Sequence, residues 1–276
     1  MTIRQVHHHG SAPGAFFVNS FIIEGERSLV LVDTQFVLSE ATAVTDKLAA
    51  LGKPLAGVVV THPHPDHYNG LATVLARHPG VPVFATAATI AGIRETAEPK
   101  RAYWTPIVGA DYPQSFAFPD VTVADGESLK LDGMELGIVD LGALECSNNT
   151  MVLLPQLDAV ITSDLVYHAV HPWLAEGRSA RWLRVLEDVE RRFGGAAAYH
   201  AGHGEPGSAR VLAGQADYLR RMRELVAEAM AAPDGLSPTR REALARRIEG
   251  LYPGWPLAMI IGVNIDGIAT ELASGG

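Results

Sequence analysis

The sequence predicts an α/β protein in which two β-sheets pack face to face under a cover of helices. From Phe16 onward, short apolar strands alternate with helical patterns. From Val121 onward, short strands recur about every 10 residues, a spacing typical of a sandwich sheet. Each half is β-rich and carries helices of its own, and two such halves bury their apolar faces by packing sheet on sheet.

The first half opens with a predicted hairpin of residues 16–23 and 28–33, followed by a helix that Ser39 can cap. Val44, Leu48 and Leu51 share one face of that helix. A β-branched run at 56–61 predicts a buried strand. The remaining expected elements are a loop at 62–70, a helix near 70–77, a strand at 81–85 and a helix at 87–97, which ends before Pro99.

Residues 100–119 are rich in aromatic residues and proline and show weak periodicity. They predict a long surface loop or lid, because unstructured loops of this length in compact domains are often functional.

The second half predicts five short strands, one helix and a closing strand. These elements lie at 121–126, 128–133, 134–142, 150–155, 159–164, 180–193 and 196–200.

The chain after Gly207 has a different character, with strong helical patterns at 208–232 and 238–249. Ser237 caps the second helix and Pro238 occupies its first position. We therefore expect one sandwich domain over 1–207 and a helical extension over 208–276 packed on it. An apolar stripe on the first helix predicts core packing, with a homodimer face as the alternative; it comprises Val211, Tyr218, Met222, Leu225 and Ala229.

Composition excludes several classes of protein. The net charge of −9 disfavours a general nucleic-acid binder. The only cysteine, Cys146, rules out an intramolecular disulfide and favours a reducing compartment. Because we find neither a signal-peptide pattern nor an apolar run near the ~20 residues of a membrane span, we expect a cytoplasmic protein with a small-molecule substrate and no membrane partner.

The stretch THPHPDHYNG, residues 61–70, carries the strongest chemical signal. It places His62, His64, Asp66 and His67 within six positions directly after a buried strand, and its prolines keep the chain from becoming helical. Imidazoles two residues apart on extended chain project to the same side and suit one metal ion, while Asp66 and His67 face a second. Four such ligands at a strand end are hard to explain by packing.

This stretch resembles the signature of the metallo-β-lactamase superfamily, His-x-His-x-Asp-His after a buried strand. The resemblance continues in order over residues 16–207 and implies an αββα sandwich of two mixed sheets. Asp33 and Thr34 match the family's Asp-Thr-Gly strand end, although Gln35 replaces the usual glycine. Asp164 matches the bridging aspartate, with Ser163 in place of a common glycine, and His203 matches the last ligand histidine. Among the branches, the glyoxalase II-like thioesterases look nearest.

The third motif departs from the family, because Gly-His-Thr is replaced in LECSNNTMVLLP. If Asn149 aligns with the motif's asparagine, Glu145 takes the place of the ligand histidine, as in the alkylsulfatase branch. The alternatives are a ligand from elsewhere in the chain or coordination by Cys146.

The resemblance implies two divalent metal ions, of which zinc is the first expectation. It assigns His62, His64 and Glu145 to one ion, Asp66, His67 and His203 to the other, and Asp164 to a bridge. Three carboxylates reduce the net charge of two dications from +4 to +1, so we predict weaker Lewis acidity and a shift of preference toward manganese or iron.

The implied activity is that of a metallo-hydrolase in which a metal-bound hydroxide attacks the carbonyl of an ester, thioester, lactone or β-lactam-like substrate. Asp66 can also orient or shuttle a proton, and His171, downstream of Asp164, could reach the substrate. The alternatives are a non-hydrolytic sensor or scaffold that keeps the metal site, and a member of an iron-dependent oxidoreductase branch.

Other side chains carry weaker expectations. Aromatic residues expected in an apolar pocket wall are Tyr103, Trp104, Tyr167 and Trp173. His200 reads as a core residue, and the run His7 to His9 reads as a flexible end without a role.

Overall fold

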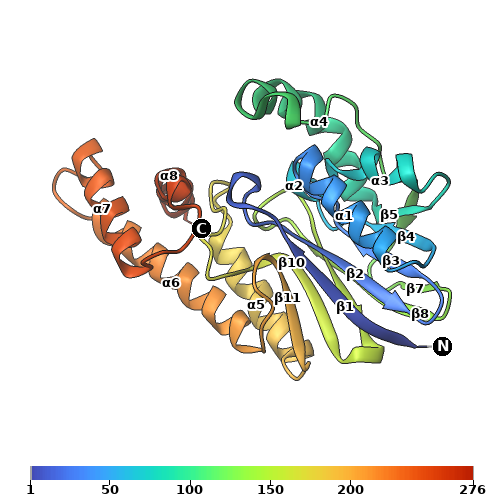
Figure 1. Ribbon diagram of the computed structural model, residues 1–276. Helices are drawn as coiled ribbons and strands as arrows, with labels where there is room; N and C mark the ends of the chain where they lie inside the picture. The colour runs from blue at the N-terminus through green and yellow to red at the C-terminus, as the bar shows by residue number, and fades with distance from the viewer. Residues whose placement is uncertain (1, 276) are drawn as a thin grey trace.

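The computed structural model describes residues 2–275 and contains two β-sheets packed face to face, which confirms the predicted sandwich (Figure 1). The first sheet has the order β1-β2-β3-β4-β5-β6 and the second the order β11-β10-β9-β8-β7. The strands are β1 (Ile3–Gly10), β2 (Asn19–Gly25), β3 (Leu29–Val32), β4 (Leu55–Val59), β5 (Val83–Thr86), β6 (Val121–Val123), β7 (Ser128–Leu131), β8 (Met134–Gly142), β9 (Asn149–Leu154), β10 (Ala159–His168) and β11 (Ala198–Gly204). Both sheets are mixed, because β3 to β6 run parallel beside antiparallel β1 and β2, and β11 runs parallel to β10.

Helices cover both outer faces. They are α1 (Leu38–Ala50), α2 (Pro65–Tyr68), α3 (Leu71–Arg77), α4 (Ala87–Val108), α5 (Ser179–Phe193), α6 (Arg210–Met230), α7 (Pro238–Leu251) and α8 (Ile261–Ala273). Figure 1 shows α1 and α3 against the first sheet, and α5 and α6 against the second.

Three apolar clusters hold the four layers together. The cluster between the sheets joins residues such as Ile23 and Val59 of the first sheet to Ile138 and Ile161 of the second. The other two lie outside the sheets, one under α1, α3 and α4 and one under the C-terminal helices. Strands buried on both faces by these clusters explain the nearly continuous apolar runs in the sequence.

The N-terminal histidine run is not a flexible end, because it forms the edge strand β1 against β2. His7 Nε2 contacts Glu24 Oε2 at 2.7 Å, and His9 Nε2 contacts Glu40 Oε2 at 2.9 Å. The pairing partner β2 lies downstream in the sequence, so composition alone gave no sign of this strand.

The expected loop over 100–119 is wrong in its first half, since α4 continues unbroken to Val108 with Pro99 and Pro106 inside it. Each proline removes one backbone donor from the helix, and a helix end before Pro99 is predicted only if that cost is decisive. Tertiary packing outweighs it, because Ile93, Ala97 and Trp104 pack into apolar clusters. The loop that remains follows Asp111.

Of the C-terminal helices, α6 packs on β10 of the second sheet, and α7 and α8 pack on α6. The apolar stripe of α6 is buried, and its residues share one cluster with Val160 and Leu165 of β10 and with Ile265 and Ile268 of α8. We did not expect α8. Within residues 2–275, no helix combines the length and apolar character that a membrane crossing requires.

Candidate metal centre

The candidate metal ligands come from four places in the sequence and meet at one end of the sandwich. His62 to His67 follow β4 and run into the single turn of α2. Asp164 lies in β10, His203 in β11, and Glu145 in the loop between β8 and β9. Pro65 begins α2, which turns Asp66 and His67 back toward the preceding histidines.

The ligand atoms on one side are those of His62, His64, Glu145 and Cys146, which all lie within 4.8 Å of one another. His64 Nδ1 is 2.7 Å from Glu145 Oε2, and His62 Nε2 is 3.5 Å from Glu145 Oε1. The Glu145 carboxylate is buried and also accepts a hydrogen bond of 3.1 Å from Asn149 Nδ2. The side chain at this position is thus turned inward, as a ligand would be.

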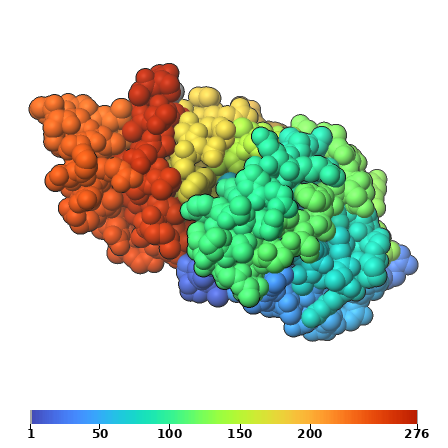
Figure 2. All heavy atoms as spheres, turned by 90° about the horizontal axis from the view of Figure 1, so that it is seen from above, coloured from blue at the N-terminus to red at the C-terminus, as the bar shows by residue number. Residues whose placement is uncertain are grey.

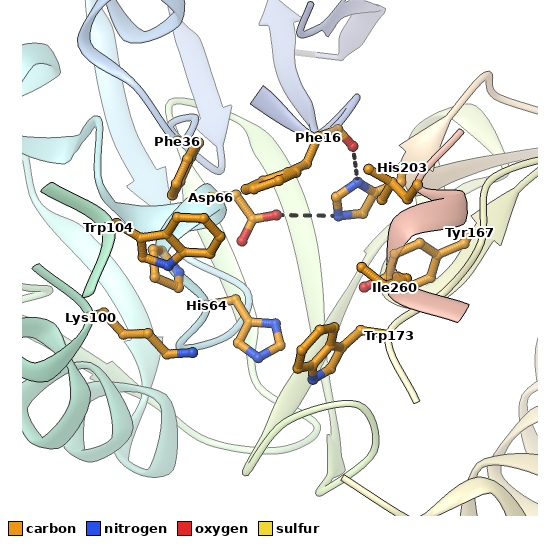
Figure 3. A pocket seen from close by; sticks show the side chains of 12 residues that line it. Phe16, Phe36, His64, Asp66, Lys100, Trp104, Tyr167, Trp173, His203 and Ile260 are labelled. Atoms are coloured by element: carbon orange, nitrogen blue, oxygen red, sulfur yellow. Dashed lines mark hydrogen bonds and ion pairs between the residues drawn. The ribbon is translucent and has the colours of Figure 1, made fainter. Parts of the chain in front are cut away.

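The ligand atoms on the other side are those of Asp66, His67 and His203. His203 Nε2 is 3.4 Å from Asp66 Oδ2, an ion pair drawn in Figure 3. Asp164 lies between the two groups: Oδ2 is 3.6 Å from His62 Nε2 and Oδ1 is 3.4 Å from His67 Nε2. A carboxylate in this position can bridge two cations.

The donor set fits metal ions. His62 Nε2, His67 Nε2 and Asp164 Oδ1 are buried and have no hydrogen-bond partner among the described residues. Leaving buried polar atoms unsatisfied costs on the order of 1–3 kcal/mol each, so their convergence indicates that they share a ligand. Imidazole nitrogen and carboxylate oxygen are ligands that zinc, manganese and iron accept.

Neighbouring side chains fix the orientation of the histidines. Asp33 Oδ2 lies 2.8 Å from His67 Nδ1 and also accepts a hydrogen bond of 2.8 Å from Thr61 Oγ1. Ser163 Oγ lies 3.1 Å from His62 Nδ1 and donates to Thr61 Oγ1 at 2.8 Å. Such outer contacts leave the Nε2 atoms of both rings facing inward. The sequence reading matched Asp33 to the family but missed the roles of Thr61 and Ser163.

The two positions where glycine is usual keep glycine-like backbone angles. Gln35 has φ 81° and Ser163 has φ 50°, both in the left-handed region. Both side chains form hydrogen bonds in this conformation. Gln35 Nε2 donates to Ser20 Oγ at 2.9 Å, and Ser163 Oγ donates to Thr61 Oγ1 at 2.8 Å. The substitutions therefore preserve the local chain path.

A second set of contacts holds His203 and the central aspartate. His203 Nδ1 lies 2.9 Å from the Phe16 carbonyl oxygen, so its Nε2 faces the cluster. The Tyr167 hydroxyl donates to Asp164 Oδ2 at 2.5 Å, and the Tyr167 ring stacks on His203 with centroids 4.6 Å apart. Tyr167 thereby fixes two candidate ligands at once.

The charges of the cluster shift several pKa values. Burial opposes the charged form of the His203 ring, but Asp164 and Asp66 raise its pKa to about 10. Burial raises the pKa of Asp66, yet His67 and His203 bring it below its usual range. Burial and the neighbouring His67 lower the pKa of His62. The metal-free cluster therefore favours ionised carboxylates.

A pocket of about 130 Å³ opens onto the cluster (Figure 3). Three expected wall residues, Trp104, Tyr167 and Trp173, line it, whereas Tyr103 is 62% exposed and does not. The residues lining the pocket are Phe16, Phe36, His64, Pro65, Asp66, Lys100, Trp104, Tyr167, Trp173, His203, Leu257 and Ile260. The sequence reading missed the contributions of Phe16, Phe36, Lys100 and the C-terminal residues, since nothing local marks them as neighbours of the motif.

The pocket lies where the two halves of the molecule meet the C-terminal helices. Figure 2 shows the segment around α4 approaching α8 across the upper face of the molecule. Trp104 and Lys100 come from α4, whereas Leu257 and Ile260 come from the segment just before α8. The C-terminal extension therefore contributes to the wall of the candidate site.

His171 lies outside this group. Its ring is fully buried, with Nδ1 2.7 Å from the Tyr218 hydroxyl and aromatic contacts to Tyr252 and Trp255. It does not line the pocket, so its position does not support the catalytic role expected for it. The geometry explains it as part of the junction between the sheet and the C-terminal helices.

Comparison with known proteins agrees with this geometry. The family model of the metallo-beta-lactamase superfamily matches residues 13–226. A metallo-beta-lactamase type 2 from Bacillus cereus is 26% identical over 208 residues, which is 73% of each chain.

Two solved structures share the fold more completely. A metallo-beta-lactamase family protein from Thermus thermophilus has a TM-score of 0.71 at 20% identity and covers 98% of this chain and 94% of its own. A stereoselective inverting sec-alkylsulfatase from Pseudomonas sp. has a TM-score of 0.64 at 20% identity, covering 92% of this chain but 47% of its own. The family match includes every candidate ligand, and the chain belongs to the metallo-beta-lactamase superfamily.

Proposed function

We propose that the protein is a dinuclear metal-dependent hydrolase that cleaves an ester, thioester, lactone or related carbonyl bond of a small organic molecule. Membership of a superfamily of mostly metallo-hydrolases supports a hydrolytic activity. The observation that carries the proposal is the convergence of seven inward-facing ligand side chains in two groups that share Asp164 as a neighbour; they are His62, His64, Asp66, His67, Glu145, Asp164 and His203.

In this proposal His62, His64 and Glu145 would hold one cation and Asp66, His67 and His203 the other, with Asp164 available to either. Two divalent ions, zinc in the first instance and manganese or iron otherwise, would supply Lewis acidity and a nucleophile at neutral pH.

The chain's own residues supply orientation and a dry environment. Asp33 and Ser163 hold the imidazoles of His67 and His62 in place, so that little reorganisation is needed when substrate binds. Asp66 lines the pocket, so its carboxylate can accept a hydrogen bond from the substrate or from a water molecule and orient it. Aromatic side chains line the pocket, and a substrate that displaces water from between them would strengthen the electrostatic interactions inside.

The test is metal content per chain, measured by elemental analysis on protein purified without chelators, together with a hydrolysis screen. We expect two equivalents of metal and turnover of at least one ester, thioester or lactone. His62→Ala should abolish turnover and lower the metal content while the far-ultraviolet circular dichroism is retained. Two bound metal ions without hydrolysis of any substrate would instead favour a sensor or scaffold.

Sulfate ester hydrolysis is the second candidate, and Glu145 favours it. The resemblance places glutamate in this position in the alkylsulfatase branch, and the carboxylate is turned into the cluster here. A secondary alkyl sulfate belongs in the same screen. Turnover of the sulfate with no turnover of carbonyl substrates would replace the first proposal by this one.

A further inference from the structure

Among the described residues, Lys100 is the only lysine or arginine that lines the pocket over the candidate metal centre. It lies on α4, in the segment for which the sequence predicts a loop. Figure 3 shows its side chain extending from the helix along the pocket wall toward His64, with the ammonium group on the pocket side. Regular helix through Pro99 therefore places a cation at the candidate site.

The ammonium group of Lys100 has no ion pair or hydrogen bond among residues 2–275. Its neighbour Arg101 differs, because its guanidinium binds Glu98 on the outer surface of the same helix. Lys53 differs from Lys100 as well, because its ammonium group forms an ion pair with Glu24. Lys100 is thus available for a partner that is not part of this chain.

The surroundings of Lys100 are apolar apart from the candidate ligands. Phe36, Trp104, Trp173 and Ile260 supply most of the wall. A half-buried cation in such surroundings is poorly solvated, so a charge-assisted hydrogen bond to an anion there is stronger than in water. Because the net charge of the chain is −9, the protein as a whole repels anions, in contrast to the position of Lys100.

We propose that the substrate is an apolar molecule with a single anionic oxygen group, which Lys100 binds at a distance from the bond to be hydrolysed. The aromatic wall takes the apolar body, and Lys100 fixes which end of the substrate faces the metal centre. This inference rests on the proposed hydrolytic function and specifies its substrate class.

The first test is binding, which needs no turnover. Decanesulfonate is a poor metal ligand, and its binding to the metal-loaded protein can be followed by isothermal titration calorimetry beside neutral 1-decanol. We expect the sulfonate to bind about tenfold more tightly than the alcohol, the difference that one charge-assisted hydrogen bond accounts for. Lys100→Met should remove that preference, Lys100→Arg should retain it, and Arg101→Met is the matched control that should retain it too.

The second test is kinetic and uses mono-p-nitrophenyl suberate, which carries a free carboxylate, and its methyl ester, which does not. We expect kcat/KM to favour the carboxylate substrate, mainly through KM, and Lys100→Met to lower that ratio about tenfold. If kcat/KM favours the carboxylate substrate but decanesulfonate binds no more tightly than decanol, the anion that Lys100 binds is a carboxylate.

Equal binding of sulfonate and alcohol, with no carboxylate preference, would overturn the inference, as would a preference that survives Lys100→Met. If the sulfonate preference depends on Lys100 but no substrate of the hydrolysis screen is turned over, these two esters included, the hydrolase proposal fails while the anion site stands. The two proposals are therefore separable.

Discussion

The burial of His171 predicts a specific loss of stability in acid. Its ring is excluded from solvent among Tyr218, Tyr252 and Trp255, and this burial lowers its pKa from 6.5 to about 4. The folded protein thus holds His171 neutral in a range where the unfolded chain would protonate it.

The free energy of unfolding depends on pH because His171 binds its proton more weakly in the folded than in the unfolded chain. Because the folded pKa lies below the unfolded value, the stabilisation is complete above pH 6.5 and is lost as the pH falls toward about 4. A pKa difference of about 2.5 corresponds to about 3.4 kcal/mol in full, and about 2 kcal/mol of it is lost between about pH 7.5 and about pH 5.

The assay is urea unfolding of the wild type and of His171→Gln at several pH values. Gln is uncharged and can still contact the Tyr218 hydroxyl, so the variant removes the titration but keeps a polar partner. The candidate ligand histidines titrate in both proteins, and their contribution cancels in the difference between the two free energies of unfolding. We expect that difference to change by about 2 kcal/mol in favour of the variant as the pH falls to about 5. A difference that does not vary with pH would refute the reasoning.

Four further predictions concern the metal centre. Glu145→His should shift metal preference from manganese or iron toward zinc, because it removes one negative charge and one oxygen ligand; competition between the metals for one metal-free sample measures it. Ser163→Ala should weaken metal binding about tenfold by releasing His62; Ser163→Gly, which suits the left-handed backbone but also lacks the hydroxyl, should weaken it equally, as measured by competition with a chelator. Tyr167→Phe should lower kcat about tenfold by freeing Asp164, with KM for a neutral ester little changed; a change confined to KM would make Tyr167 a wall residue only. Chelation should lower the thermal midpoint, since metal binds the folded state alone; an unchanged midpoint in differential scanning calorimetry would contradict this.

The sequence alone determined the sandwich architecture and the core of the candidate site. The short β-branched apolar runs at 56–61 and 159–164 identify buried strands because a strand covered on both faces of its sheet needs apolar side chains at successive positions. The motif from His62 to His67 lies within six consecutive residues, so its ligand types and their spacing can be identified from that short segment of the sequence alone. Asp164 and His203 could be found only through the family resemblance, since each is a single residue far from that motif.

Tertiary structure decided what long-range contacts control. The strand β1 exists because β2 pairs with it, and α4 passes through two prolines because its apolar face is buried. The pocket joins Lys100 on α4 to Leu257 near the C-terminus, a proximity that no local pattern encodes. His171 follows the metal motif's Asp164 closely in sequence, yet the chain turns it away into the aromatic junction with α6. Local pattern thus specified the ligand types, whereas packing between distant segments specified which other side chains surround them.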